Sequence, residues 1–170
     1  LTFLDEAGLG GCLALDMGLG KTPTILARIG AQPGDAPALV VAPPAVVGNW
    51  AAEARRFTPD LNVLVHHGPT RASGAALKAK IRAADLVITT YGTSVRDIED
   101  LAEIAWDRVV LDEAQVIKNH RSATAKELRK LNARVRLALT GTPIENGLGD
   151  LWAIMDFCNP GFLGDQPTFR

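Results

Sequence analysis

The stretch "LDMGLGKT" at residues 15–22 ends in Gly-Lys-Thr, as do many loops that bind nucleotide phosphates. The backbone N–H groups of such a loop can point at phosphate oxygens, and the following helix adds the positive end of its dipole. The residues expected at the phosphates are Gly18, Leu19, Gly20, Lys21 and Thr22. Lys21 would neutralise the outer phosphates, and the hydroxyl of Thr22 would bind Mg²⁺. The common pattern has another glycine where this chain has Leu15, so an ordinary glycine-rich turn is the alternative.

Two acidic residues, Asp112 and Glu113, directly follow the apolar run that ends at Leu111. A phosphate-bound Mg²⁺ needs oxygen ligands, often through water, and Asp112 could supply one. Hydrolysis needs a base that orients a water at the outer phosphate, and Glu113 is placed for that role. The alternative is an aspartate at a strand end that caps a helix. The glycine loop and the acidic pair support each other, because each supplies what the other lacks.

The remaining polar residues indicate less chemistry on their own. The hydroxyls of Thr140 and Thr142 could link a nucleotide site to a part that moves, but the segment 140–146 also fits a simple polar turn. His66 and His67 have no third metal ligand or nucleophile beside them, which favours a surface or packing role. Three tryptophans and two cysteines lie in apolar surroundings and predict packing and buried free thiols, respectively. These residues are Trp50, Trp106, Trp152, Cys12 and Cys158.

Six short apolar runs, each followed by a helical stretch, must position these candidates. The runs are 11–17, 38–44, 61–68, 85–92, 108–114 and 135–143. The helical stretches are 21–30, 46–57, 70–83, 94–104, 122–131 and 148–157. Ser94 with Asp97 and Thr124 with Glu127 have the spacing of capping boxes at helix starts. The alternation predicts an α/β fold with a parallel sheet covered on both faces, where ligands bind beyond the carboxyl ends of the strands.

The bulk composition suits one ordinary domain with a substantial core. The chain has 170 residues, of which 47% are hydrophobic. Its net charge of −1 removes an overall basic balance as an argument for nucleic-acid binding but leaves room for a local basic face. No apolar stretch approaches the ~18 residues of a membrane span, and no signal peptide is visible. The chain starts at Leu1 rather than Met and ends without a closing signal, so we expect a fragment of a longer protein.

Five blocks of sequence, taken together and in order, resemble the first RecA-like lobe of Swi/Snf-type ATPases, which are helicase-like translocases of the second superfamily. The blocks are "DMGLGKT" at 16–22, "VVAPPAVVGNWAAE" at 40–53, "VITTYGT" at 87–93, "LDEAQVIKN" at 111–119 and "LTGTPIENGLGDLWAIMDF" at 139–157. They span nearly the whole chain. The resemblance implies a RecA-like three-layer α/β/α sandwich with a mainly parallel sheet, and it implies that residues 1–170 form the first lobe, truncated at both ends.

The resemblance also implies roles for particular residues. It implies ATP and Mg²⁺ at the glycine loop and Asp112, with Glu113 and Lys21 as the catalytic residues. It implies that Gln115, Thr140 and Thr142 couple the state of ATP to lobe movement. Double-stranded DNA would track near Pro43, Thr90, Tyr91 and Lys118. Two positions depart from the family: Leu15 stands where an acid is usual, and Gln115 stands where many members have His.

The implied activity is ATP-dependent translocation on double-stranded DNA without strand separation. The alternatives are a strand-separating DNA or RNA helicase and a non-hydrolysing interaction module. The family's second lobe, with its arginine finger, would follow Arg170, so we expect the chain alone to be nearly inactive as an ATPase. Twelve Arg against six Lys favour a GC-rich bacterial genome, hence a cytoplasmic protein at the nucleoid with no nucleosome and no membrane as a partner. In a eukaryote the location would be nuclear.

Overall fold

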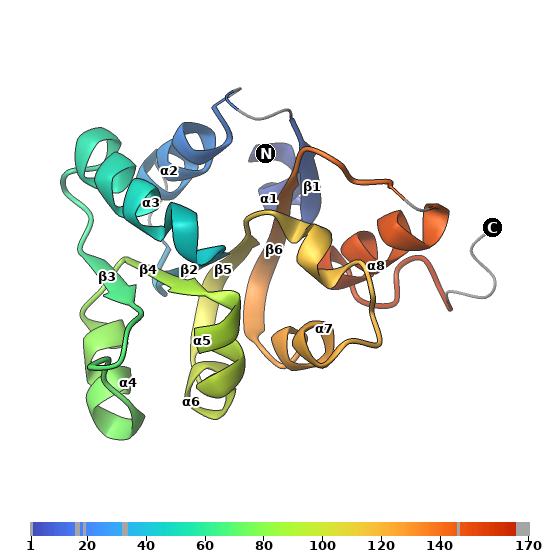
Figure 1. Ribbon diagram of the computed structural model, residues 1–170. Coiled ribbons are helices and arrows are strands. Elements are labelled where there is room, and N and C mark those ends of the chain that lie inside the picture. The colour runs from blue at the N-terminus through green and yellow to red at the C-terminus, as the bar shows by residue number, and fades with distance from the viewer. Residues whose placement is uncertain (1, 16–17, 19, 32–33, 146, 166–170) are drawn as a thin grey trace.

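A six-stranded, all-parallel sheet forms the centre of the protein in the computed structural model, with strand order β1-β6-β5-β2-β4-β3 (Figure 1). The structure describes residues 2–15, 18, 20–31, 34–145 and 147–165. The strands are β1 (Gly11–Ala14), β2 (Ala38–Ala42), β3 (Val63–His66), β4 (Leu86–Thr90), β5 (Ala105–Leu111) and β6 (Asn132–Thr140). The helices are α1 (Thr2–Glu6), α2 (Lys21–Ala31), α3 (Pro44–Phe57), α4 (Gly74–Arg82), α5 (Tyr91–Arg96), α6 (Ile98–Ala102), the 3₁₀ helix η1 (Ala114–Ile117), α7 (Ala123–Leu128) and α8 (Leu148–Cys158).

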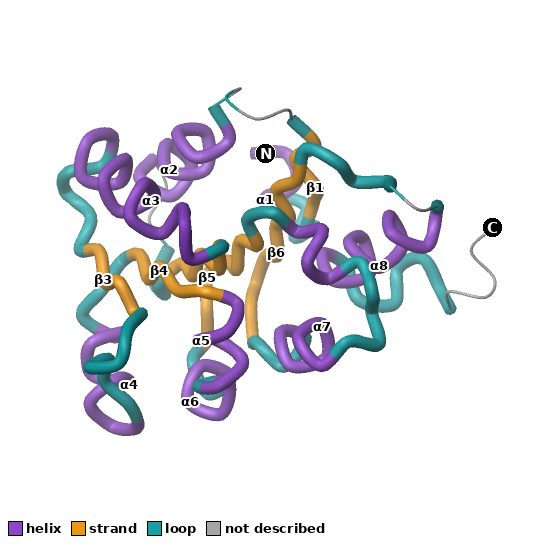
Figure 2. Tube along the Cα trace, in the orientation of Figure 1, coloured by secondary structure: helices purple, strands orange, loops and turns teal. Residues whose placement is uncertain are grey.

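Helices cover both faces of the sheet, and each face has its own apolar core (Figure 2). The helices α2 and α3 pack on one face, and α4 to α8 pack on the other. Successive residues of β5 alternate between the two cores: Val109 and Leu111 belong to one, and Val110 belongs to the other. Since side chains on a strand point to opposite faces in turn, a strand buried on both sides must be apolar at nearly every residue.

All six apolar runs of the sequence form strands, as predicted, and the RecA-like α/β fold is confirmed. One predicted helix, 94–104, is instead two short helices, α5 and α6. The predicted capping box of Ser94 with Asp97 is wrong, because α5 begins directly after β4 and Thr90 caps it by accepting from the N–H of Thr93. Asp97 lies between the two helices, and its side chain binds Arg71.

The second predicted capping box is also wrong. The hydroxyl of Ser122 accepts from the backbone N–H of Ala125, so α7 starts at Ala123 and neither Thr124 nor Glu127 caps it. Both errors have the same physical cause. More than one Ser or Thr lies near the start of each of these helices, and which of them caps the helix depends on where the preceding strand or loop ends.

The strand register brings the carboxyl ends of the inner strands to one edge of the sheet. Ala14 at the end of β1 pairs with Thr140 at the end of β6, and Ala42 at the end of β2 pairs with Thr90. Leu111 at the end of β5 pairs with Val41. The polar residues that follow these strands are therefore neighbours in space, as the predicted site requires. No helix in the described part of the chain is long and apolar enough to cross a bilayer.

Candidate nucleotide and magnesium site

Two glycines of the loop between β1 and α2 have backbone conformations that favour glycine. Gly18 has φ of 83° and Gly20 has φ of 79°, both in the left-handed region. A Cβ added at either position would have no neighbour within 4 Å, so conformation rather than space selects glycine here. The open surroundings leave room for a ligand beside the loop. Leu19, which the sequence places between these glycines, lies outside the described residues.

Lys21 is the first residue of α2, and its ammonium lies over the loop. Its Nζ donates to the carbonyl oxygen of Leu15 at 2.8 Å. The hydroxyl of Thr24 donates to the carbonyl of Gly20 at 2.7 Å and closes the start of the helix. Thr22 is the second residue of α2, and the first turn of this helix has no acidic residue. The helix start therefore has a positive dipole end and a cation with no opposing carboxylate in that turn, which favours an anion.

Asp112 follows β5, and hydrogen bonds hold both its backbone N–H and its carboxylate. Its backbone N–H donates to the carbonyl of Val41 at 2.8 Å. Its Oδ1 accepts from the N–H of Glu113 at 2.9 Å, and its Oδ2 accepts from Nε1 of Trp50 at 2.8 Å. Burial raises the pKa of Asp112, while both donors and the positive charge of Lys21 act to lower it. Nζ of Lys21 bonds Leu15 just beyond β1, and β1 and β5 both pair with β6, so Lys21 and Asp112 lie at the same edge of the sheet although they are far apart in sequence.

Glu113 has an unusual backbone conformation. Its φ of 50° and ψ of 55° are left-handed, and no other non-glycine residue in the described ranges has a positive φ. Such a conformation costs about 1–3 kcal/mol and is found mainly where function requires it. Oε2 of its half-buried carboxylate accepts from Nε2 of Gln115 at 2.7 Å. The strained residue is the one that the sequence nominates as the base.

A chain of hydrogen bonds runs from Glu113 to the end of β6. The hydroxyl of Thr140 donates to Oε1 of Gln115 at 3.0 Å, and the N–H of Thr142 donates to the same hydroxyl at 3.1 Å. Thr140 is fully buried, whereas Thr142 is exposed. The structure therefore joins the three predicted coupling residues to the predicted base in one connected network.

The residues present suit a magnesium ion that is shared with a nucleotide. Within the described ranges there is no group of three His, Cys, Asp or Glu side chains that could hold a metal alone. Mg²⁺ is commonly bound by one or two carboxylates together with substrate phosphates and water. Oδ1 of Asp112 accepts from the N–H of Glu113 and Oδ2 accepts from Trp50, and each oxygen has a further lone pair for a metal or a metal-bound water. Asp112 and Thr22 would hold the ion, and Lys21 would hold the phosphates.

The predicted DNA-contacting residues lie at the same edge but differ in accessibility. Pro43 precedes α3 and is half-buried. Thr90 is buried, and the hydroxyl of Tyr91 donates to the carbonyl oxygen of Asp112 at 2.6 Å inside the protein. Nζ of Lys118 lies 2.7 Å from Oε2 of Glu145. A DNA contact by these residues stays a prediction: Pro43 and Lys118 are half-buried, and Thr90 and Tyr91 are buried.

Sequence reasoning missed the bond between Trp50 and Asp112. Trp50 was expected only to pack, and it does pack, with 1% of its surface exposed. The one signal in the sequence was chemical, because tryptophan is an apolar side chain with an N–H donor that needs a partner when buried. Which acceptor it finds, 62 residues away, is a fact of the tertiary structure.

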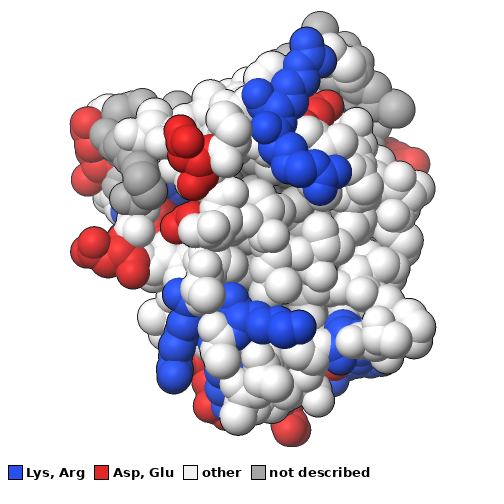
Figure 3. All heavy atoms as spheres, turned by 90° about the vertical axis from the view of Figure 1, so that its left-hand side faces the viewer, with Lys and Arg blue, Asp and Glu red and all other residues white. Residues whose placement is uncertain are grey.

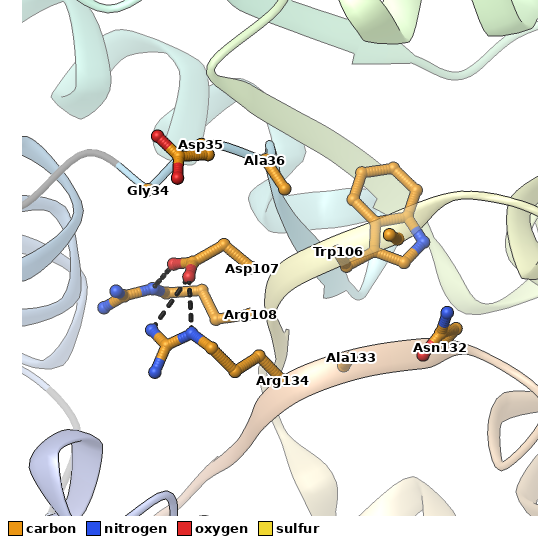
Figure 4. A pocket seen from close by; sticks show the side chains of 10 residues that line it. Gly34, Asp35, Ala36, Trp106, Asp107, Arg108, Asn132, Ala133 and Arg134 are labelled. Atoms are coloured by element: carbon orange, nitrogen blue, oxygen red, sulfur yellow. Dashed lines mark hydrogen bonds and ion pairs between the residues drawn. The ribbon is translucent and has the colours of Figure 1, made fainter.

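A cavity of about 550 Å³ lies at the opposite edge of the sheet, where β5 and β6 begin (Figure 4). The carboxylate of Asp107 accepts there from Nε of Arg108 at 2.7 Å and from Nε of Arg134 at 2.8 Å. Burial alone would raise the pKa of Asp107, but the two guanidinium groups lower it below its usual value. These ion pairs stabilise the amino ends of two strands and lie away from the predicted site.

Lys and Arg side chains near the β3 edge of the sheet form two separate groups. Figure 3 shows the side of the molecule on which β3 and α4 lie, and its Lys and Arg side chains form two groups with an uncharged band between them. The last turn of α3 carries Arg55 and Arg56, and the last turn of α4 carries Lys80 and Arg82. Although the net charge of the chain is −1, this side of the molecule therefore has two local basic patches.

The parallel sheet, the helices on both faces and the glycine loop before α2 define an α/β domain of the RecA-like class. The sequence pattern of the SNF2-related domain matches residues 1–170, and the chain belongs to this family. The resemblance to Swi/Snf-type ATPases predicted from the five sequence blocks is thereby confirmed.

Known relatives and solved structures agree with this assignment. The chain is 45% identical over 176 residues to YwqA of Bacillus subtilis, a protein named as an ATP-dependent helicase/translocase, and covers 19% of it. It is 37% identical over 175 residues to the ISWI chromatin-remodeling complex ATPase ISW2 of Saccharomyces cerevisiae and covers 16% of it. These matches include 100% and 99% of this chain, respectively. The chain thus spans less than a fifth of the length of either relative.

A solved structure has the same fold. The Sulfolobus solfataricus SWI2/SNF2 ATPase core, in complex with double-stranded DNA, superposes with a TM-score of 0.84 at 40% sequence identity. The match covers 98% of this chain and 35% of that one.

Proposed function

We propose that the protein is an ATP-dependent double-stranded DNA translocase in which this chain is the first ATP-binding lobe. The observation that carries the proposal is the meeting of Lys21, at the start of α2, with Asp112 and Glu113, after β5, at the carboxyl edge of the sheet. A phosphate-binding cation, a candidate magnesium ligand and a candidate base converge there. Membership of the family and the solved relative bound to DNA support DNA as the track.

The residues divide the chemistry of ATP hydrolysis among themselves. The N–H groups of the glycine loop and the ammonium of Lys21 bind the phosphates. To do so, Lys21 gives up its hydrogen bond to the carbonyl of Leu15 and bonds a phosphate oxygen instead. Mg²⁺, when bound by Asp112 and Thr22, neutralises charge on the phosphates. Glu113 orients the attacking water and accepts its proton, and Gln115 holds the carboxylate by its bond to Oε2.

The coupling and DNA roles are part of the same proposal. The network through Gln115 and Thr140 would report the state of the nucleotide to a second RecA-like lobe. DNA would run along the edge near Pro43, the start of α5 and Lys118. Because an arginine from a second lobe contributes orders of magnitude in related hydrolases, we propose that this chain alone turns over little ATP. Since DNA is the track, the protein would act in the nucleoid of a bacterium or the nucleus of a eukaryote.

The test is Mg²⁺-dependent ATP hydrolysis by the full-length protein, with and without duplex DNA, beside its Glu113→Gln variant. We expect turnover that duplex DNA stimulates and that the variant loses while it still binds ATP. Turnover accompanied by separation of the strands would favour a helicase instead. A full-length protein that binds ATP but never hydrolyses it, with DNA present, would make it an interaction module and overturn the proposal.

A further inference from the structure

We propose that Trp50 and Tyr91 are positioning residues that fix the orientation of Asp112 for magnesium. This inference rests on the proposed function. Nε1 of Trp50 donates to Oδ2 of Asp112 at 2.8 Å, and the hydroxyl of Tyr91 donates to the carbonyl oxygen of Asp112 at 2.6 Å. The donors come from α3 and α5, so two separate helices hold one aspartate by its side chain and by its backbone.

The bond from Trp50 fixes the carboxylate as packing alone could not. Trp50 is 1% exposed and Asp112 is 8% exposed, so water competes little for either group. Oδ1 accepts from the N–H of Glu113 and Oδ2 accepts from the indole of Trp50. Because each oxygen has a donor, the orientation of the carboxylate plane is fixed. A lone pair on each oxygen is left for a metal or its water. Groups that orient a metal ligand commonly matter almost as much as the ligand.

The bond from Tyr91 acts on the peptide that joins Asp112 to Glu113. The carbonyl that accepts from Tyr91 belongs to the same peptide unit as the N–H that donates to Oδ1 of Asp112. Because a peptide unit is planar, holding its carbonyl also sets the direction of its N–H. The same peptide leads into the left-handed conformation of Glu113. Tyr91 therefore stabilises the arrangement of both acidic residues.

The two helices that carry these donors begin at the edge where DNA is proposed to bind. The first residue of α3 follows Pro43, and α5 begins at Tyr91 itself. A shift at the start of either helix would move a donor of Asp112. The clamp, which is formed by Trp50 and Tyr91, thus connects that edge to Asp112, the proposed magnesium ligand, through two hydrogen bonds.

The experiment compares three variants of the full-length protein that each remove one buried hydrogen-bond donor and leave an aromatic ring at the position. Trp50→Phe and Tyr91→Phe remove the two donors of the clamp. Trp106→Phe is the matched control, because Trp106 is equally buried and its Nε1 donates at 2.9 Å to the carbonyl of Leu101, away from Asp112. The readouts are equilibrium binding of a fluorescent ATP analogue as Mg²⁺ is titrated, ATP turnover at low and high Mg²⁺, and thermal unfolding without Mg²⁺.

We expect Trp50→Phe to raise the Mg²⁺ concentration for half-maximal binding of the analogue about tenfold. Tyr91→Phe should raise it about threefold, since its bond is to a neutral carbonyl. Trp106→Phe should leave it unchanged, although its thermal midpoint falls like that of Trp50→Phe. High Mg²⁺ should restore turnover in both clamp variants.

The outcomes separate this inference from the proposed function. If the unaltered protein needs Mg²⁺ but both clamp variants respond to it as Trp106→Phe does, the clamp is structural only and the inference is wrong. If the unaltered protein binds the analogue without regard to Mg²⁺ but still hydrolyses ATP with duplex DNA present, the inference alone is wrong. If the unaltered protein hydrolyses no ATP at any Mg²⁺ concentration with DNA present, the proposed function fails. Should Trp50→Phe not fold, Tyr91→Phe decides alone, because its ring is retained and only a hydroxyl is lost.

Discussion

The side-chain amide of Gln115 lies between the carboxylate of Glu113, to which it donates at 2.7 Å, and the hydroxyl of Thr140, from which it accepts at 3.0 Å. An amide has a fixed donor end and a fixed acceptor end, so it can join these two groups without any change of protonation. The bond to Glu113 involves a charged partner, and such bonds are stronger than neutral ones. Gln115 is thus the physical link between the acid after β5 and the end of β6.

Replacing Gln115 with Glu should slow hydrolysis of ATP by the full-length protein. The change substitutes an acceptor for the donor that faces Glu113, so the base loses its hydrogen bond and gains a repulsive neighbour. We expect turnover to fall roughly tenfold to a hundredfold, which is the rate loss that corresponds to the free energy of one hydrogen bond to a charged group. The affinity for ATP should be nearly unchanged. Steady-state kinetics would measure this. Thr140→Val, which leaves the bond to Glu113 intact, should have the smaller effect. Turnover by the Gln115→Glu variant at the unaltered rate would mean that this bond does not support the base.

Lys21→Ala should weaken ATP binding more than it changes stability. The ammonium bonds the carbonyl of Leu15 in the free protein and would bond phosphate in the complex, and a charge-assisted bond is worth about 1.5–3 kcal/mol. Affinity for a fluorescent ATP analogue should therefore fall about tenfold to a hundredfold. Lys130→Ala is the matched control, because Lys130 is exposed and pairs with Glu127 at 2.7 Å. Similar affinities in the two variants would remove Lys21 from the site.

Asp97→Asn should destabilise the protein at neutral pH and much less in acid. Arg71 bonds both carboxylate oxygens of Asp97, at 2.6 and 2.8 Å, and His66 bonds one at 2.7 Å. The hydrogen bond from Arg71 is the main cause that lowers the pKa of Asp97; burial opposes it, and His66 adds to the lowering. The pKa of Asp97 is therefore lower in the folded protein than in the unfolded chain, where it is about 4, so the ionised carboxylate stabilises the fold at pH values above about 4. This stabilisation is lost as the pH falls through the folded-state pKa.

Urea unfolding between pH 7 and pH 3 would test this dependence on Asp97. The free-energy difference between wild type and Asp97→Asn should be largest near neutrality, at about 1–3 kcal/mol, and should shrink below about pH 4. Asp60→Asn, at an exposed position, should show neither effect. A difference that persists unchanged at pH 3 would mean that charge on Asp97 is not what stabilises the fold.

Two glycine substitutions should have opposite effects on stability. A Cβ at Gly10 would collide with the backbone carbonyl oxygens of Cys158 and Arg136, which cannot turn away as a flexible side chain could. Gly10→Ala should therefore cost about 1–3 kcal/mol. Gly48 lies within α3 with nothing within 4 Å of its added Cβ, so Gly48→Ala should stabilise the protein by about 0.5–1 kcal/mol. Thermal midpoints of the two variants should move in opposite directions.

The strands could be predicted from the sequence because their apolar runs are short, continuous and followed by polar residues. Helix starts were harder where a strand leads straight into a helix. Thr90 ends β4 and also caps α5, so no loop residue marks the boundary, and the prediction placed the helix three residues late, at Ser94 instead of Tyr91. Local signals do not reveal such shared residues, because the position at which the strand ends is decided by its neighbours in the sheet.

The site was predictable in its members but not in its internal contacts. The glycine loop and the acidic pair have local patterns, and their meeting follows from the parallel sheet. The direction of the Tyr91 side chain does not follow from any pattern. Its residue lies at the expected edge, yet its hydroxyl bonds the carbonyl of Asp112 within the protein. The same holds for Trp50, whose acceptor is determined by how α3 packs on the sheet.

The position of β1 in the sheet has a consequence for the order in which a ribosome delivers the parts of this lobe. In the described sheet β1 pairs with β6 alone, and the pairing of Gly11 with Leu137 joins residues 126 positions apart (137 − 11). A nascent chain emerges from its first residue onward, so β1 is synthesised long before its partner exists. Of the six described strands, the one that leads into the proposed phosphate loop is therefore made first and paired last. Under the proposed function, nucleotide would stabilise this lobe only after β6 has left the exit tunnel and β1 has paired with it.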